Sequence, residues 1–77
     1  MIADSARKHG VSAEDVIHAM RNTLVSLLTD VEDRVIVVGP GRDGRLLEVV
    51  VLDRPGQEVL VIHAMACRPK FLRYLER

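Results

Sequence analysis

The residues best suited to chemistry lie in the last twenty positions of the chain, Glu58–Arg77 (EVLVIHAMACRPKFLRYLER). His63 is a candidate proton-transfer group, because imidazole titrates near neutrality. A basic segment follows it, in which residues 68–77 hold four cations and one acid. Tyr74, the only tyrosine, is a second candidate catalytic residue, whose hydroxyl can orient a phosphate. Because lysine and arginine bind RNA phosphates, three of the cations are candidate phosphate-binding residues: Arg68, Lys70 and Arg73.

Each of these candidates also has a structural interpretation. His63 lies inside a strongly apolar run, where a histidine often serves only to complete a hydrogen bond at a sheet face. The Tyr74 ring, one position from Leu75, can pack at the edge of the core with its hydroxyl in water. The basic segment can be a solvated face that balances residues 11–33, where one Arg stands against five acids. Both interpretations stay open at this point.

No residue pattern predicts a metal site or a cofactor. The glycine-rich stretch Gly39–Gly44 lacks the GxxxxGK(S/T) pattern of a phosphate-binding loop and is followed by a strand pattern, so it predicts a hairpin connection. A lowered thiol pKa beside Arg68 would need a partner that the sequence does not show. The remaining candidate ligands have no HxxxH or CxxH spacing: His9, His18 and Cys67.

Length and composition place the chain in a narrow class. A length of 77 residues predicts a single domain, residues 1–77, whose core is aliphatic because the chain has no Trp, one Phe and one Tyr. So small a core often gains burial by association, and we therefore expect a homo-oligomer or a complex with a partner chain. Zero net charge argues against nucleic-acid binding through the overall charge of the protein.

The cysteine content and the apolar runs predict a cytoplasmic protein with no membrane contact. One cysteine excludes an internal disulfide and fits a reducing compartment. The first ten residues lack the apolar centre of a signal peptide. No apolar run approaches the roughly 20 residues that span a bilayer.

The elements that must position these residues form an α+β domain of two N-terminal helices, an antiparallel four-stranded meander and a short C-terminal helix. Ile2–His9 is the first predicted helix, with Gly10 as its stop. Ser12 caps the second, which should end near Asn22 in a left-handed conformation. Short connections between strands force hairpins. Turn formers separate four strand patterns: Leu24–Thr29, Arg34–Val38, Arg45–Leu52 and Glu58–Met65.

The third and fourth strand patterns, LLEVVVL and VLVIHAM, are apolar at nearly every position. A strand with one face in water should alternate, so we expect both faces of the sheet to be covered. Helices can cover one face, and the other then needs a partner or a second copy. Pro69 opens the predicted C-terminal helix, which runs to the end of the chain with Phe71, Leu72 and Leu75 turned inward.

Three segments, in this order, resemble the BrnT-type toxins, which have a RelE-like fold. ARKHGVSAEDV is similar to their basic-His-Gly turn and Ser-capped helix. RVIVVGPGRDGRLLEVVV is similar to their central hairpin. VLVIHAMACRPKFLRYLER is similar to their last strand and basic C-terminal helix, so that Arg68, Lys70 and Arg73 match the basic segment and Tyr74 lies close to the terminal aromatic residue.

The resemblance implies a toxin of a bacterial type II toxin–antitoxin module. It further implies an antiparallel sheet with helices packed on it, a cytoplasmic location, a protein antitoxin as partner, and RNA cleavage without a metal. Cleavage of this kind needs a base and cations on the scissile phosphate, the roles assigned to His63 and to the basic segment.

The chain departs from the toxin pattern at two positions. Met65 stands where a basic residue is expected, and His63 stands where a small polar residue is usual. Two hypotheses follow. In the first, His63 belongs to a variant ribonuclease site. In the second, the chain is a non-catalytic dimeric module that binds a partner protein through its apolar sheet.

Overall fold

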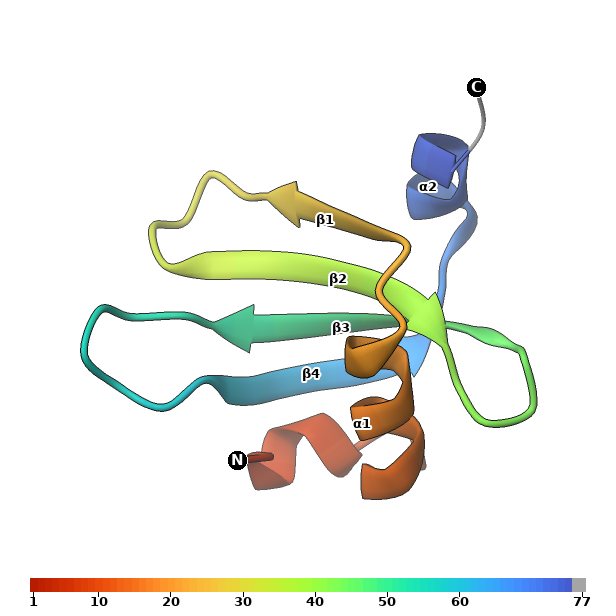
Figure 1. The fold of residues 1–77 in the computed structure, drawn as a ribbon, viewed down its shortest axis with the longest axis horizontal. Coiled ribbons are helices and arrows are strands. Elements are labelled where there is room, and N and C mark those ends of the chain that lie inside the picture. The colour runs from red at the N-terminus through yellow and green to blue at the C-terminus, as the bar shows by residue number, and fades with distance from the viewer. Residues whose placement is uncertain (76–77) are drawn as a thin grey trace.

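The sheet at the centre of the molecule is an antiparallel meander in the order β1-β2-β3-β4 (Figure 1). A computed structural model describes residues 1–75, so the last two positions of the predicted C-terminal helix lie outside the described residues. The four-stranded meander is confirmed, with strand boundaries that agree with the prediction to within two residues. The strands are β1 (Val25–Leu28), β2 (Arg34–Pro40), β3 (Leu46–Leu52) and β4 (Leu60–Ala66).

The prediction of two N-terminal helices is wrong. The chain before Gly10 forms a single 3-10 turn, η1 (Asp4–Arg7), after an extended start. Ile2 makes a parallel bridge with Val61, and the Ala3 N–H donates to the Val61 carbonyl at 2.8 Å. Docking on β4 thus holds the first residues extended and leaves too few for an α-helix. Gly10 has a φ of 76° and ends the turn in the left-handed conformation that only glycine adopts easily.

The helix α1 (Ala13–Arg21) begins as predicted. The Ser12 side chain accepts a hydrogen bond from the Asp15 N–H at 3.2 Å, which satisfies one of the free amides at the helix start. The prediction for its end is wrong in conformation, since Asn22 has a φ of −120° rather than a positive one. Its side-chain amide donates to the His18 carbonyl at 2.8 Å, in addition to the bonds of its backbone N–H to the His18 and Ala19 carbonyls.

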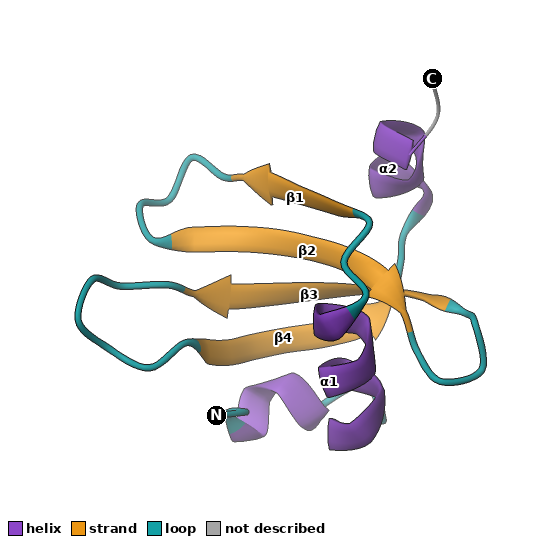
Figure 2. Ribbon diagram, in the orientation of Figure 1, coloured by secondary structure: helices purple, strands orange, loops and turns teal. Residues whose placement is uncertain are grey.

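The core lies between one face of the sheet and the N-terminal elements, with α1 and η1 on the same side (Figure 2). Alternation puts every second strand residue on this face. The strand register aligns Val37, Val49 and Ala64 in one row across β2, β3 and β4. All three are buried and pack with Val16 and Ala19 of α1. The helix thus buries its apolar stripe against the aliphatic side chains of this row on β2, β3 and β4.

Gly39 of β2 sets how closely α1 approaches the sheet. A Cβ added at this position would fall well inside van der Waals contact with the Ala19 carbonyl oxygen, which is backbone and cannot rotate away. We therefore expect Gly39→Ala to lower the free energy of unfolding by about 2 kcal/mol, through overpacking. Urea unfolding checks this. Gly44→Ala, whose added Cβ meets nothing within 4 Å, shows for comparison the cost of a side chain at a positive φ without a clash. Equal stability of Gly39→Ala and the wild type would show that α1 has room to move.

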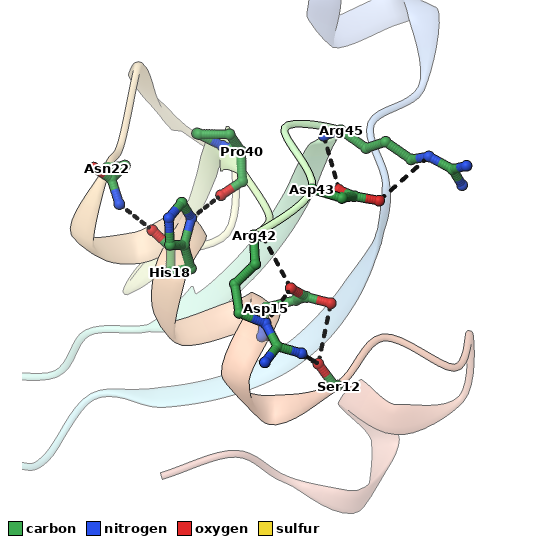
Figure 3. Close-up of polar contacts among 8 residues, drawn as sticks. All are labelled: Ser12, Asp15, His18, Asn22, Pro40, Arg42, Asp43 and Arg45. Carbon is green, nitrogen blue, oxygen red and sulfur yellow. Dashed lines mark hydrogen bonds and ion pairs between the residues drawn. The ribbon is translucent and has the colours of Figure 1, made fainter.

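Polar contacts tie α1 to the β2–β3 turn (Figure 3). Asp15 accepts from the Arg42 backbone N–H at 3.0 Å and from its Nε at 2.9 Å. One turn along the helix, His18 Nδ1 lies 2.8 Å from the Pro40 carbonyl oxygen. Helix and hairpin are therefore joined by a charged pair at one point and by an imidazole at another.

Asp15 gives this fold a measurable pH dependence. The Arg42 backbone N–H, then its side chain, lower the pKa of Asp15 from 3.8 to about 2. A carboxyl whose pKa is lower in the folded state stabilises the fold above the unfolded pKa and loses that contribution as the pH falls from about 4 to about 2. In an NMR titration, Arg42→Ala should return the Asp15 pKa only part of the way to 3.8, because the backbone N–H remains. A full return would show that the side chain alone sets the shift.

The opposite face of the sheet, called here the second face, carries neither α1 nor η1. Alternation and the strand register place these half-buried apolar side chains on it: Val25, Leu27, Ile36, Leu46, Val50, Leu52, Leu60 and Met65. The C-terminal segment, α2 (Pro69–Leu72) and η2 (Arg73–Leu75), lies against one end of this face. The predicted C-terminal helix thus begins at Pro69 as expected, but its α-helical part is a single turn. Within residues 1–75 none of the helices has the length and apolarity needed to cross a membrane.

Candidate functional site

A buried carboxylate, Glu48, is the centre of the candidate site. It lies in the middle of β3 on the second face and its side chain is 0% exposed. An ionised carboxylate in such a position needs a bound cation or several hydrogen bonds to offset the loss of hydration. Arg68 supplies both, through its backbone N–H at 2.9 Å, its Nε at 2.9 Å and its Nη2 at 2.7 Å.

The local chain path brings Arg68 back over the sheet. The Cys67 N–H donates to the Leu46 carbonyl at 2.9 Å, which prolongs the pairing of β4 with β3 by one bond. Arg68 is extended, with φ −76° and ψ 150°, the conformation that a following proline favours. Pro69 then starts α2. The strand end and the proline thus turn both the backbone N–H and the guanidinium of Arg68 toward Glu48.

His63 contacts the same carboxylate from β4. Its Nε2 lies 3.2 Å from Glu48 Oε2, and its side chain is 27% exposed. An ionised carboxylate can only accept, so Nε2 carries the proton and Nδ1 is left as the nitrogen able to take one up. The His9 ring lies edge-on at 5.5 Å between centroids. The arrangement is that of an imidazole oriented by a carboxylate and reachable from solvent.

The charge state of Glu48 is fixed by its partners. Burial by itself raises the pKa of this carboxyl, but the hydrogen bonds and the charge of Arg68, with a smaller contribution from His63, hold the pKa below its usual value of 4.5. Glu48 is therefore ionised at neutral pH, and the Arg68 pKa is raised in return. The pair is neutral as a unit, and two of the three guanidinium nitrogens are already engaged.

The other predicted site residues lie apart from this cluster. Lys70 Nζ lies 5.0 Å from the centroid of the Phe71 ring. The Arg73 guanidinium lies 5.2 Å from the centroid of the Tyr74 ring, and its Nη2 donates to the Tyr74 hydroxyl at 3.4 Å. Among residues 1–75 no hydrogen bond joins Tyr74 to His63. The structure thus brings together His63 and Arg68, and leaves Lys70, Arg73 and Tyr74 along the C-terminal segment.

A groove of about 430 Å³ separates this segment from β1. Leu27 and Ile36 line it from the sheet, and Lys70, Phe71 and Tyr74 line it from α2 and η2. It combines an apolar floor with an ammonium group and a phenol at its rim. An extended chain with apolar or aromatic groups and a negative charge suits such a surface.

The remaining histidines and the cysteine have identified surroundings. Burial and then the charge of Glu48 raise the pKa of the Cys67 thiol, so it stays protonated at neutral pH and is a poor nucleophile. His18 is bonded to the Pro40 carbonyl, and His9 contacts the His63 ring. In the part of the chain that the structure describes, no group of three His, Cys, Asp or Glu side chains is arranged to hold a metal ion.

The sequence interpretation missed Glu48, the residue on which the cluster depends. One signal was available in the strand LLEVVVL, where a single acid interrupts six apolar residues. A charge in a strand that is buried on both faces requires a partner, and the nearest basic residues after the next strand begin at Arg68.

Comparisons with known proteins add no relative. No protein-family model matches the chain, and neither a curated protein nor a solved structure shows significant similarity to it. A functional proposal therefore depends on the site geometry and on the resemblance carried by the residues themselves.

Proposed function

We propose that this chain is a toxin-like component of a bacterial type II toxin–antitoxin module and cleaves RNA in the cytoplasm without a metal ion. One observation carries the proposal: an imidazole, oriented by a buried carboxylate, shares that carboxylate with the arginine that begins the basic C-terminal segment. The residues of this segment resemble the last strand and helix of BrnT-type toxins with a RelE-like fold. A cognate antitoxin protein is the implied partner.

In the proposed reaction, His63 acts as the base. Its Nδ1 takes the proton of a ribose 2′-hydroxyl, whose oxygen attacks the adjacent phosphorus. The bond from phosphorus to the 5′ oxygen breaks, water supplies a proton to that oxygen, and a 2′,3′-cyclic phosphate remains. Glu48 keeps the imidazole in the tautomer that leaves Nδ1 free.

The cations bind the phosphate in this proposal. Arg68 has one guanidinium nitrogen, Nη1, beyond the two that bond to Glu48. Lys70 and Arg73 extend the positive surface along the C-terminal segment, and the Tyr74 hydroxyl orients the RNA phosphate that they bind. Positive groups at this place stabilise the charge that grows on the phosphate oxygens in the transition state.

RNA ends produced by the purified protein test the proposal. The chain should cleave a labelled single-stranded RNA in the presence of EDTA and leave 2′,3′-cyclic phosphate and 5′-hydroxyl ends, and its induction should arrest bacterial growth. A matched preparation of His63→Gln controls for contaminating nucleases. Intact RNA at equimolar wild-type protein, together with normal growth, would contradict the proposal.

A second candidate function is a non-catalytic module that binds a partner protein through the second face of the sheet. The half-buried Val50, Leu52 and Leu60 favour it, because apolar side chains of this number on one sheet face suit a protein contact. Engagement of Arg68 by Glu48 favours it as well. If this second function is correct, a small protein encoded by a neighbouring gene should co-purify with the wild type but not with Leu60→Lys, and no RNA should be cleaved.

A further inference from the structure

The two edges of the sheet differ in whether their backbone groups are paired. The outer edge of β4 is occupied by the N-terminus: the Ala3 N–H donates to the Val61 carbonyl at 2.8 Å, and the Val61 N–H donates to the Met1 carbonyl at 2.9 Å. The other edge is β1, which pairs only with β2 among the described strands. In Figure 1 its outer side faces away from every other strand. One edge of the sheet is thus closed within residues 1–75, and one is open.

The open edge strand is short, at four residues, but it lacks the charged and proline residues that protect such edges in monomers. Natural edge strands carry lysine, proline, a bulge or an inward charge that prevents pairing with another chain. The segment Leu24–Leu28 (LVSLL) contains no charge and no proline. Leu24 is 58% exposed and Leu28 is 89% exposed. Both leucines offer apolar surface that a second strand would cover.

The side chains of β1 are complementary to themselves. Ser26 and Leu28 lie on one face of β1 because they alternate, and Leu24, at the bend just before the strand, is as far from Ser26 along the chain as Leu28 is. In an antiparallel pair of two copies related by a two-fold axis at Ser26, each Leu24 lies opposite a Leu28 of the second copy. On the other face each Val25 lies opposite a Leu27. Every pair is then apolar against apolar, except Ser26 against itself.

The charges that flank β1 favour the same arrangement. Arg21 precedes the strand, and three acids follow it: Asp30, Glu32 and Asp33. Antiparallel pairing brings the basic start of one copy toward the acidic end of the other, whereas parallel pairing would put acid beside acid. The zero net charge of the chain also removes the general repulsion between copies.

We infer that two copies of this chain pair through their β1 edges, antiparallel about a two-fold axis at Ser26, and so extend the sheet across the dimer. An isologous contact of this kind closes on itself and leaves no further edge to propagate. The two grooves beside β1 then lie next to each other on the second face. The inference is independent of catalysis at His63.

Sedimentation over a concentration series tests the dimer. The wild type should become dimeric as its concentration rises. Leu28→Lys should remain a monomer with an unchanged circular dichroism spectrum, because the side chain is almost fully exposed in the single chain. Ile17→Lys, which places the same charge on an exposed apolar position of α1, should dimerise like the wild type. A wild type that stays monomeric, or an equal loss in both variants, would overturn the inference.

Cysteine cross-linking tests the register. In a Cys67→Ala background, Ser26→Cys should form an intermolecular disulfide on mild oxidation, since directly opposed Cα atoms of an antiparallel pair lie about 4.5–5.5 Å apart, a separation that a disulfide spans. Leu28→Cys alone should not, because its opposite neighbour is Leu24; a mixture of Leu24→Cys and Leu28→Cys chains should cross-link. Efficient linking of Leu28→Cys with itself, or no linking at Ser26 in a dimer, would overturn the pairing.

Discussion

Arg68→Ala is expected to lower the free energy of unfolding by about 3 kcal/mol, a large part of the stability of so small a domain. The substitution leaves the fully buried Glu48 carboxylate with only His63 and the backbone N–H of residue 68 as partners. A buried charge without its cation either takes up a proton or opens the structure. Urea unfolding at pH 7 by circular dichroism measures the loss.

Two controls separate the charge of this pair from its shape. Glu48→Gln should cost less than Arg68→Ala, because the guanidinium that it leaves behind is 45% exposed and can be hydrated. The pKa of Glu48 is lowered in the folded state, so the pair stabilises the fold above the usual pKa of 4.5 and loses this effect as the pH falls below it. The unfolding free energies of the wild type and Arg68→Ala should therefore converge in acid. A constant difference down to pH 3 would contradict this explanation.

His63→Gln is expected to lower the rate of RNA cleavage by about 10²–10⁴-fold while the fold remains intact. The glutamine amide can still donate a hydrogen bond to Glu48, but it has no nitrogen that accepts a proton at neutral pH. Because His63 is only partly buried, the change leaves no large cavity. Initial rates on a labelled RNA in EDTA, with unfolding curves of both proteins, measure the effect.

His9→Gln is the matched control for this substitution. It removes the imidazole whose ring contacts His63, yet leaves the bond between His63 and Glu48 in place. It should cleave RNA within a few-fold of the wild-type rate. Cleavage by His63→Gln at the wild-type rate would discard His63 as the base, and an equal loss in both variants would show that the ring contact, rather than proton transfer, matters.

Much of the sheet could be predicted because its turns are encoded locally. Pro55 and Gly56 occupy the central positions of a turn closed by a bond from the Gln57 N–H to the Arg54 carbonyl at 3.1 Å, and Gly56 has the positive φ of 73° that this requires. The end of β2 was misplaced because Gly39 usually signals a turn. Here its missing side chain makes room for the backbone of α1.

The N-terminal error has a non-local cause. Residues 2–9 have an acceptable helical composition, but the backbone bonds that they make with β4 decide their conformation. Propensity is a weak guide where tertiary contacts compete. The sequence of one chain does not indicate that its first residues pair with the edge of a distant strand.

The candidate site could be predicted only in part. His63 and Arg68 were identified from residue type, and the structure places both on one carboxylate. Glu48 lies 15 and 20 positions away from them, so its role depends on the register of β3 and β4. That register shifts between Val50 and Val51, where β4 has one extra residue, and no residue type in the sequence predicts this bulge. The roles of Lys70, Arg73 and Tyr74 stay predictions.

A double-mutant cycle between Glu48 and Arg68 measures most directly whether this one ion pair holds the C-terminal segment on the sheet. We expect Glu48→Leu and Arg68→Leu to be strongly destabilising when made singly. The double variant should be more stable than the sum of the two losses predicts, by at least about 2 kcal/mol, because removing both charges leaves none buried without a partner. Losses that add to within about 0.5 kcal/mol would contradict the central place given to Glu48.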